Sequence, residues 1–191
     1  MVLQLDLMPR PILELLYLRR AWRIAVDIDL PGLDPLPEIG ASTLPDAADR
    51  FLWEVRWKKK WKQAWSAQTA GQYRVPGTDI LACGTGHVQE QEDWTSEFGR
   101  AGFDGAALTR WEQKILGTYE RESLRAAHQE QVEPVIIAAW ERGLEQVTAL
   151  PWVGFVSQRL GGSQLVTSLS TLNDAQRFRT ALAQWIKDSP Q

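Results

Sequence analysis

The chain has 191 residues, 44% of them hydrophobic, which is enough for one good core and hardly enough for two. Its net charge of −3 gives the whole chain no attraction to nucleic acid or to an anionic membrane. A single cysteine, Cys83, excludes an internal disulfide and a thiolate zinc cluster, and it suits a reducing compartment. No secretory signal or uncharged apolar run of membrane-spanning length is evident, so we expect one cytoplasmic domain over 1–191.

The first elements alternate between strand and helix patterns. Residues 2–7 place leucines at every second position, which predicts a strand. After two prolines, the apolar spacing and the closing arginines predict a helix over 11–23. Alternation returns at 25–30 and predicts a second strand, with Asp27 and Asp29 on one side of it. These two carboxylates could hold a divalent ion, but we favour a solvated sheet edge.

The middle of the chain contains two stretches rich in loop-forming residues. Four prolines and two glycines make 31–45 an extended connection. A helical pattern then runs from 46 to 67. Glycine and polar residues predict a loop region over 68–105, interrupted by a short helix within 88–98.

Helices resume after this region and lead to a hairpin near the end of the chain. Apolar residues at helical spacing predict helices over 108–131 and 134–148, with the break before Pro134. Strands over 152–159 and 164–169 flank a glycine pair, which is typical of a hairpin.

The last element is an amphipathic helix that begins after Thr171 or Asn173 as its cap. Its spacing predicts that Phe178, Leu182 and Trp185 pack against the hairpin strands. The order of elements predicts an α+β fold: a mainly helical single domain with a small antiparallel sheet, which includes the C-terminal β-hairpin followed by a helix.

The helix over 46–67 carries four tryptophans at intervals of four residues, namely Trp53, Trp57, Trp61 and Trp65. At about 100° per residue, these indoles cover an arc of about 120° on one side of the helix. Four exposed indoles would form a patch of roughly 800 Å², larger than soluble monomers usually show. We therefore expect the central Trp57 and Trp61 to be buried, while Trp53 or Trp65 keeps a face in solvent.

The same helix is locally basic. Residues 49–65 carry six basic and two acidic side chains, a local net charge of +4. An acidic run in the later segment could neutralise this charge within the fold; its members are Glu90, Glu92, Asp93 and Glu97. Otherwise the helix is a candidate binding surface. Its candidate binding residues are Trp53, Trp65, Lys58, Lys59, Lys60 and Lys62.

One glycine-rich stretch resembles a cofactor motif. TDILACGTGHV, residues 78–88, is similar to the first motif of class I methyltransferases, whose turn cradles S-adenosylmethionine. In this chain the acidic residue is displaced to Asp79, and no later strand ends in an acidic residue for the ribose. We therefore interpret the stretch as a glycine-rich loop and predict no cofactor.

Other chemical signals are weak. Cys83 and His87 are four residues apart, but the glycines between them oppose a helix, and no second ligand pair follows; we predict no metal site. His128 has no carboxylate one helical turn away, so we do not expect it to act as a base. The common nucleophile, nucleotide and zinc-protease motifs are missing from the sequence, and we assign no catalytic residue.

The sequence therefore favours a non-catalytic interaction protein of the immunity or regulatory type. We expect it to bind another protein through the tryptophan- and lysine-rich helix or through the adjacent acidic segment, and we disfavour nucleic acid and membrane surfaces. The alternative is an enzyme or small-ligand binder with a pocket between loop 83–87 and that helix.

Overall fold

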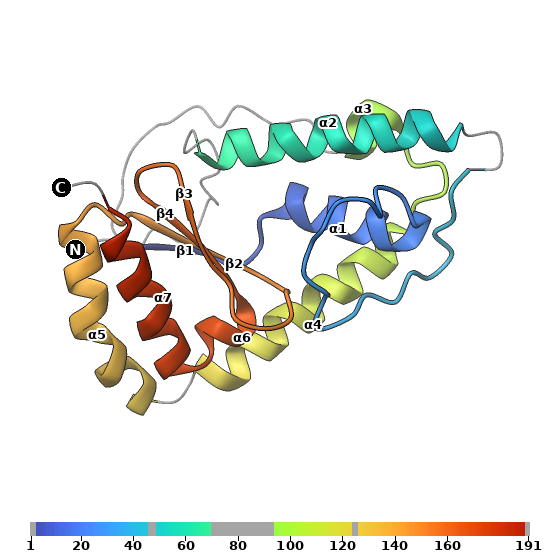
Figure 1. The fold of residues 1–191 in the computed structure, drawn as a ribbon. Coiled ribbons are helices and arrows are strands. Elements are labelled where there is room, and N and C mark those ends of the chain that lie inside the picture. Colours follow the sequence, from blue (N-terminus) through green and yellow to red (C-terminus); the bar gives the residue numbers. More distant parts are fainter. Residues whose placement is uncertain (1–2, 46–48, 70–93, 124–125, 190–191) are drawn as a thin grey trace, which may run out of the picture. The chain divides into compact units, whose positions relative to one another are not determined.

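The computed structural model describes residues 3–45, 49–69, 94–123 and 126–189, which contain seven helices and four strands (Figure 1). The chain forms two compact units. The sheet unit comprises Met1–Met8, Pro31–Pro35 and Gln113–Gln191, and the tryptophan unit comprises Pro9–Leu30 and Leu36–Glu112. None of the described helices is both long and apolar enough to cross a membrane. A single domain over 1–191 stays a prediction.

The sheet unit is built on a mixed four-stranded sheet. Its strands are β1 (Gln4–Asp6), β2 (Gln146–Leu150), β3 (Ser157–Leu160) and β4 (Gln164–Ser168), in the spatial order β1-β2-β4-β3. Both β1 and β4 run parallel to β2, and β3 runs antiparallel to β4. The α+β class is confirmed, but the prediction of an antiparallel sheet is wrong because two of the three strand pairs are parallel.

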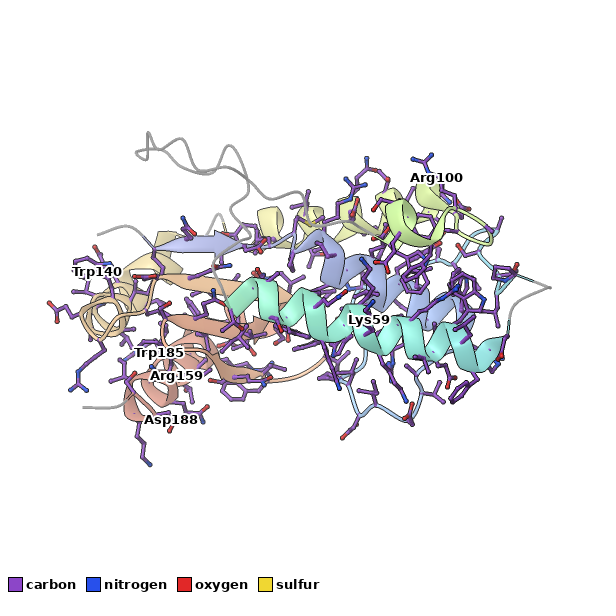
Figure 2. All side chains as sticks on the ribbon, turned by 90° about the horizontal axis from the view of Figure 1, so that it is seen from above. Lys59, Arg100, Trp140, Arg159, Trp185 and Asp188 are labelled. Carbon is purple, nitrogen blue, oxygen red and sulfur yellow. The ribbon has the colours of Figure 1, made fainter. Side chains whose placement is uncertain are left out.

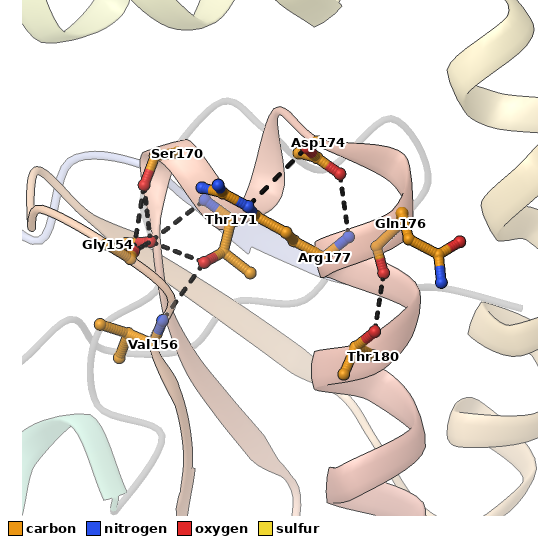
Figure 3. A network of polar contacts seen from close by, with 9 residues as sticks. Gly154, Val156, Ser170, Thr171, Asp174, Gln176, Arg177 and Thr180 are labelled. Atoms are coloured by element: carbon orange, nitrogen blue, oxygen red, sulfur yellow. Dashed lines mark hydrogen bonds and ion pairs between the residues drawn. The ribbon is translucent and has the colours of Figure 1, made fainter.

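The segment between β2 and β3 explains the parallel pairing. The Gly154 carbonyl accepts a hydrogen bond from Ser170 Oγ at 3.1 Å, and the Val156 amide donates to Thr171 Oγ1 at 3.2 Å (Figure 3). These contacts hold the segment beside the end of β4. The chain therefore reaches the edge of the sheet before β3 begins. β4 then runs back between β2 and β3, antiparallel to β3 and parallel to β2. β3 occupies only the end of the strand predicted over 152–159.

Helix α7 (Ala175–Lys187) covers β3 and β4 and also packs against α5 (Ala126–Glu141), while α6 (Leu169–Leu172) connects β4 to α7 (Figure 1). Phe178, Leu182 and Trp185 are buried, as predicted from their helical spacing. The cap is Asp174, whose Oδ1 accepts the Arg177 amide at 2.9 Å, rather than the predicted Thr171 or Asn173.

Arginine 159 ties the β3–β4 turn to the end of α7. Its guanidinium lies 4.5 Å from the centre of the Trp185 ring. Figure 2 labels both residues. It donates to the Gly162 carbonyl and to Ser189 Oγ, both at 2.6 Å. Trp185 Nε1 in turn donates to the Gln164 carbonyl at 3.0 Å, so the turn, β4 and α7 form one connected structure.

Two boundaries in this unit differ from the predictions. β2 overlaps the end of the helix predicted over 134–148 and continues to Leu150; all five of its residues are buried, so no polar alternation marked it as a strand. Pro134 lies inside α5 rather than at its start, because packing of α5 on α7 overrides the local preference. Gly143, with a φ of 94°, follows the end of α5 and was the available stop signal.

The tryptophan unit is organised around α1 (Arg10–Trp22). Its other helices are α2 (Arg50–Thr69), α3 (Trp94–Phe98) and the first part of α4 (Gly105–Ser123). Every residue from Ile12 to Leu18 is buried, so α1 is the central helix of this unit. It packs against both α2 and α3. The predicted helix over 11–23 is confirmed.

The irregular segment after residue 35 is fastened to α1 and to the start of α4. Tyr17 Oη and Ser42 Oγ lie 2.7 Å apart, and Asp104 Oδ2 accepts the Ala41 amide at 3.0 Å. Gly40 has a φ of 55°, and a Cβ there would collide with the Asp104 side chain. These contacts fix a proline-rich segment that has no regular secondary structure of its own.

The strand predicted over 25–30 is not formed. Instead, the Arg19 guanidinium donates to the Ala25 carbonyl at 3.2 Å and to the Ile28 carbonyl at 2.7 Å. The side chain of Val26 is exposed, which leaves the apparent apolar alternation without a core to face. Since Arg19 already satisfies these carbonyls, the segment turns beneath α1 and does not join a sheet.

We expect Leu182→Ala to lower the free energy of unfolding by about 2–5 kcal/mol, because a fully buried side chain would leave a cavity. Arg179→Ala on the exposed side of α7 is the control and should change it by less than about 0.5 kcal/mol. Urea titration of both variants measures the difference. Equal, small effects would show that α7 does not depend on this contact.

Candidate functional site

Helix α2 has a well-defined beginning. Asp49 Oδ1 accepts hydrogen bonds from the Phe51 amide at 2.9 Å and from the Leu52 amide at 3.3 Å. An aspartate here satisfies amides that have no partner within the helix and also complements the positive end of its dipole. The helix then continues to Thr69, so the helical pattern predicted through 67 is confirmed.

Trp57 is the residue that attaches α2 to the core. Its side chain is fully buried, and its Nε1 donates to the Leu15 carbonyl on α1 at 2.7 Å. The Trp61 ring stacks on it, with 5.0 Å between ring centres and 13° between planes. Trp65 meets Trp61 edge-on at 5.6 Å. The predicted burial of Trp57 is confirmed.

Trp61 is half-buried, like Trp53 and Trp65, so the predicted contrast between Trp61 and the ends of the arc is not found. The buried residues of α2 are Trp57, Lys60, Ala64, Ala67 and Gln68. Spaced at about 100° per residue, they centre about 50° away from the middle of the tryptophan arc. The small Ala64 and Ala67 occupy the side toward the core, and this rotation moves Trp61 and Trp65 to its margin. Trp65 therefore keeps part of its surface in solvent, as predicted.

Trp53 contributes to an aromatic cluster rather than to a solvent-facing surface. Its ring centre lies 5.4 Å from that of Trp22, 5.7 Å from that of Trp94 and 6.2 Å from that of Phe98. The Arg56 guanidinium lies 4.8 Å from its ring centre. Trp53 is thus half-buried among groups from three helices, two of which lie outside α2.

The four candidate lysines fall into two groups. Lys58 Nζ lies 2.6 Å from Asp27 Oδ2, and this hydrogen bond holds the pKa of Asp27 below its ordinary value. Lys60 is buried and forms an ion pair with Glu97, whose side chain is partly covered. Lys59 and Lys62 are exposed, and Lys59 is labelled on α2 in Figure 2. The predicted pairing between α2 and the acidic segment is confirmed for Glu97.

Exposed apolar side chains accompany these two lysines. Phe51, Leu52 and Val55 have 72%, 43% and 47% of their surface exposed. With Lys59 and Lys62 they make up what we call the outer face of α2. The signal for it was present in the sequence, because Phe51, Leu52 and Val55 lie across the helix from the tryptophan arc.

Several candidate groups lie outside the described residues. These are Cys83, His87 and the rest of loop 78–88, together with Glu90, Glu92, Asp93 and the side chain of His128. Among the residues that are described, no three or more histidine, cysteine, aspartate or glutamate side chains gather as metal ligands. Asp27 is half of an ion pair, and Asp29 lies exposed near it.

Glu112 is a carboxyl group of the tryptophan unit whose pKa is raised. Burial raises the pKa of Glu112 on α4 above its ordinary value of 4.5. The Arg10 guanidinium, whose Nε lies 3.9 Å from Glu112 Oε1, opposes this shift only weakly because Arg10 is largely exposed. Glu112 Oε1 is buried without a hydrogen-bond partner in the described part of the chain.

Comparisons with known proteins give no relative: no protein-family model, curated protein or solved structure matches the chain.

We expect Trp57→Ala to lower the free energy of unfolding by about 3–5 kcal/mol, because it empties a fully buried site. Trp57→Phe should lower it by about 1–3 kcal/mol, because the Leu15 carbonyl loses the indole donor and the smaller ring fills less of the site. The matched control is Trp65→Ala, which should cost less than half as much as Trp57→Ala. Chemical denaturation followed by circular dichroism measures all three, and equal costs for Trp57 and Trp65 would contradict the arrangement.

Glu112 should make stability depend on pH. Its pKa is higher in the folded than in the unfolded protein, so the folded state binds more protons, and stability falls as pH rises from about 4.5 through the raised value. Glu112→Gln removes the buried charge and should raise the melting temperature at neutral pH, with the gain vanishing below about pH 4. The control is Glu133→Gln, the same substitution at an exposed position on α5. Identical profiles for wild type and Glu112→Gln would refute the assignment.

Proposed function

We propose that the protein is a non-catalytic binding module whose outer face of α2 contacts an acidic surface on another protein. The observation that carries the proposal is the exposure of Phe51, Leu52 and Val55 beside Lys59 and Lys62 on one helix. The face thus offers apolar contacts near the start of α2 and cationic contacts about 6–10 Å beyond Val55 along the helix axis.

The apolar part of this face lies across α2 from the residues that attach the helix to the core. Trp57 and the other buried residues already attach the helix to the core on its opposite side. Exposed apolar area is unfavourable in water by about 25 cal/mol per Å², and neighbouring apolar side chains on a surface commonly mark interaction sites. Covering Phe51, the most exposed of the three, would give the largest gain.

The exposed charges on the outer face indicate which charge the partner surface carries. Lys59 and Lys62 are exposed on this face, whereas the nearby Lys58 and Lys60 are engaged with Asp27 and Glu97. A complementary surface therefore presents carboxylates beside an apolar contact. A second copy of the same face is a poor partner, because it would bring lysines close to lysines.

The composition of the face favours a protein over other macromolecules. Recognition of anionic lipid usually needs clusters of about four to eight basic residues, and the outer face supplies two. Binding of nucleic acid depends on many phosphate contacts and a strongly basic surface. A mixed apolar and charged face is instead typical of protein interfaces.

The proposal is tested with the double variant Phe51→Asp/Val55→Asp, which reverses the chemistry of the apolar part. Phe51 lies in the first turn of α2, where aspartate is favourable, and Val55 is exposed, so folding should be preserved. The matched control is Val153→Asp, an equally polar change at an exposed valine of the sheet unit. Proteins captured from source cells are identified by mass spectrometry, and affinity is then measured with the purified partner.

We expect the partner to be acidic and its dissociation constant to rise at least about tenfold in the double variant, with less than about a twofold change in Val153→Asp. Added salt should weaken the wild-type complex. A partner that binds all three proteins equally would overturn the proposal. So would binding to vesicles of equimolar phosphatidylserine and phosphatidylcholine that the double variant abolishes, because the face would then serve a membrane.

A further inference from the structure

Helix α3 is too short to be stable by itself. It has five residues, Trp94–Phe98, and isolated helices need about 12–15 residues to form in water. Its order must therefore come from contacts with the rest of the tryptophan unit. These contacts are made by side chains from α1 and α2, which we call the α3 contact surface; its members are Glu14, Trp22, Trp53, Arg56 and Lys60.

Two aromatic anchors hold α3 to this surface. The Trp94 ring centre lies 5.6 Å from that of Trp22 and 5.7 Å from that of Trp53, and Trp94 is buried. The Phe98 ring meets the Trp53 ring edge-on at 6.2 Å, and the Arg56 guanidinium lies 5.1 Å from the Phe98 ring centre. Aromatic pairs of this kind contribute roughly 0.5–1.5 kcal/mol each beyond their burial.

Polar contacts fix the position and direction of α3. Glu97 forms an ion pair with the buried Lys60. The Trp94 amide at the beginning of α3 donates to Glu14 Oε2 at 2.9 Å, and Glu14 is itself buried on α1. A carboxylate from another helix thus caps α3. The groups that receive α3 lie on α1 and α2; they are the Glu14 cap, the Lys60 cation and the rings of Trp22 and Trp53.

The residues of α3 that make these contacts are one helical turn apart. Trp94, Glu97 and Phe98 are at positions i, i+3 and i+4, so they share one face. Short amphipathic helices are recognised through such anchors on the surfaces of other proteins. We propose that the α3 contact surface is a binding site for a partner segment with the pattern aromatic-x-x-acidic-aromatic, and that α3 is its intramolecular occupant.

The proposal explains why so polar a set of groups lies beneath a five-residue helix. A buried lysine and a buried glutamate are unfavourable in an ordinary core, where apolar residues of similar volume serve as well. On a recognition surface they select an acidic residue at the fourth position and a helix N-terminus at the first. α3 has a high effective concentration because it is tethered, so a partner must bind in competition with it.

The probe for this site is a fluorescein-labelled peptide of residues 94–100, WTSEFGR. It is titrated by fluorescence anisotropy into the full-length variant Trp94→Ala/Phe98→Ala, whose own α3 lacks both anchors. We expect saturable binding to this variant and binding to the wild type weaker by on the order of tenfold or more, because α3 competes. The same peptide with alanine at both aromatic positions is the negative control.

A second variant is used if Trp94→Ala/Phe98→Ala does not unfold cooperatively and so is not properly folded. Glu97→Lys keeps both anchors but places a cation against Lys60, which should loosen α3 and raise peptide affinity above that of the wild type. Adding Lys60→Glu to Glu97→Lys restores the pair with opposite signs and also places a carboxylate against the glutamate of the peptide, so affinity should fall to the wild-type level or below. Absence of binding to every folded variant, or equal affinity for wild type and variants, would overturn the proposal. Neither outcome bears on the outer face of α2, because none of its residues is changed.

Discussion

The hydrogen bond from the Trp57 indole to the Leu15 carbonyl sets the orientation of α2, and the surfaces of the tryptophan unit depend on that orientation. A buried carbonyl in the middle of α1 accepts a donor from a second helix, and the indole that supplies it fills the space between the two helices. Once Trp57 is fixed, the 100° step of the helix decides which neighbours face inward. Lys60 is thereby directed toward α3, and Phe51 and Val55 are directed to solvent.

The lysines of α2 are likewise divided between positions that face inward and positions that face solvent. Lys60 is buried and forms an ion pair with Glu97, and Glu97 is placed there because Trp94 and Phe98 hold α3. Lys58 is paired at the margin with Asp27, in a segment that Arg19 has folded beneath α1. A run of three lysines thus has three different environments, and only Lys59 projects fully into water.

Periodicity in the sequence was sufficient to predict the buried side chains of an element where one side of that element faces a core. The spacing of Phe178, Leu182 and Trp185 predicted the docking of α7, and the tryptophan arc predicted that Trp57 is buried. Periodicity was insufficient where packing decided whether a segment forms a strand, or which side of a helix faces the core. β2 is buried on both faces and therefore lacks alternation, and the segment around Val26 has alternation but no sheet to join. For α2, Ala64 and Ala67 determined the rotation, and small residues give only a weak pattern.

The position of β1 in the sheet has a consequence for how the protein is made. β1 pairs with β2, with Gln4 opposite Gln146, so β1 has no partner on β2 until about 140 further residues have been synthesised. At about 5–20 residues per second, this interval is roughly ten to thirty seconds. The chain segments of the tryptophan unit emerge within it, so that unit can acquire structure while the sheet still lacks β2 and β4. Contacts so distant in sequence form slowly, and closure of the sheet around β2 is accordingly a late event in biosynthesis.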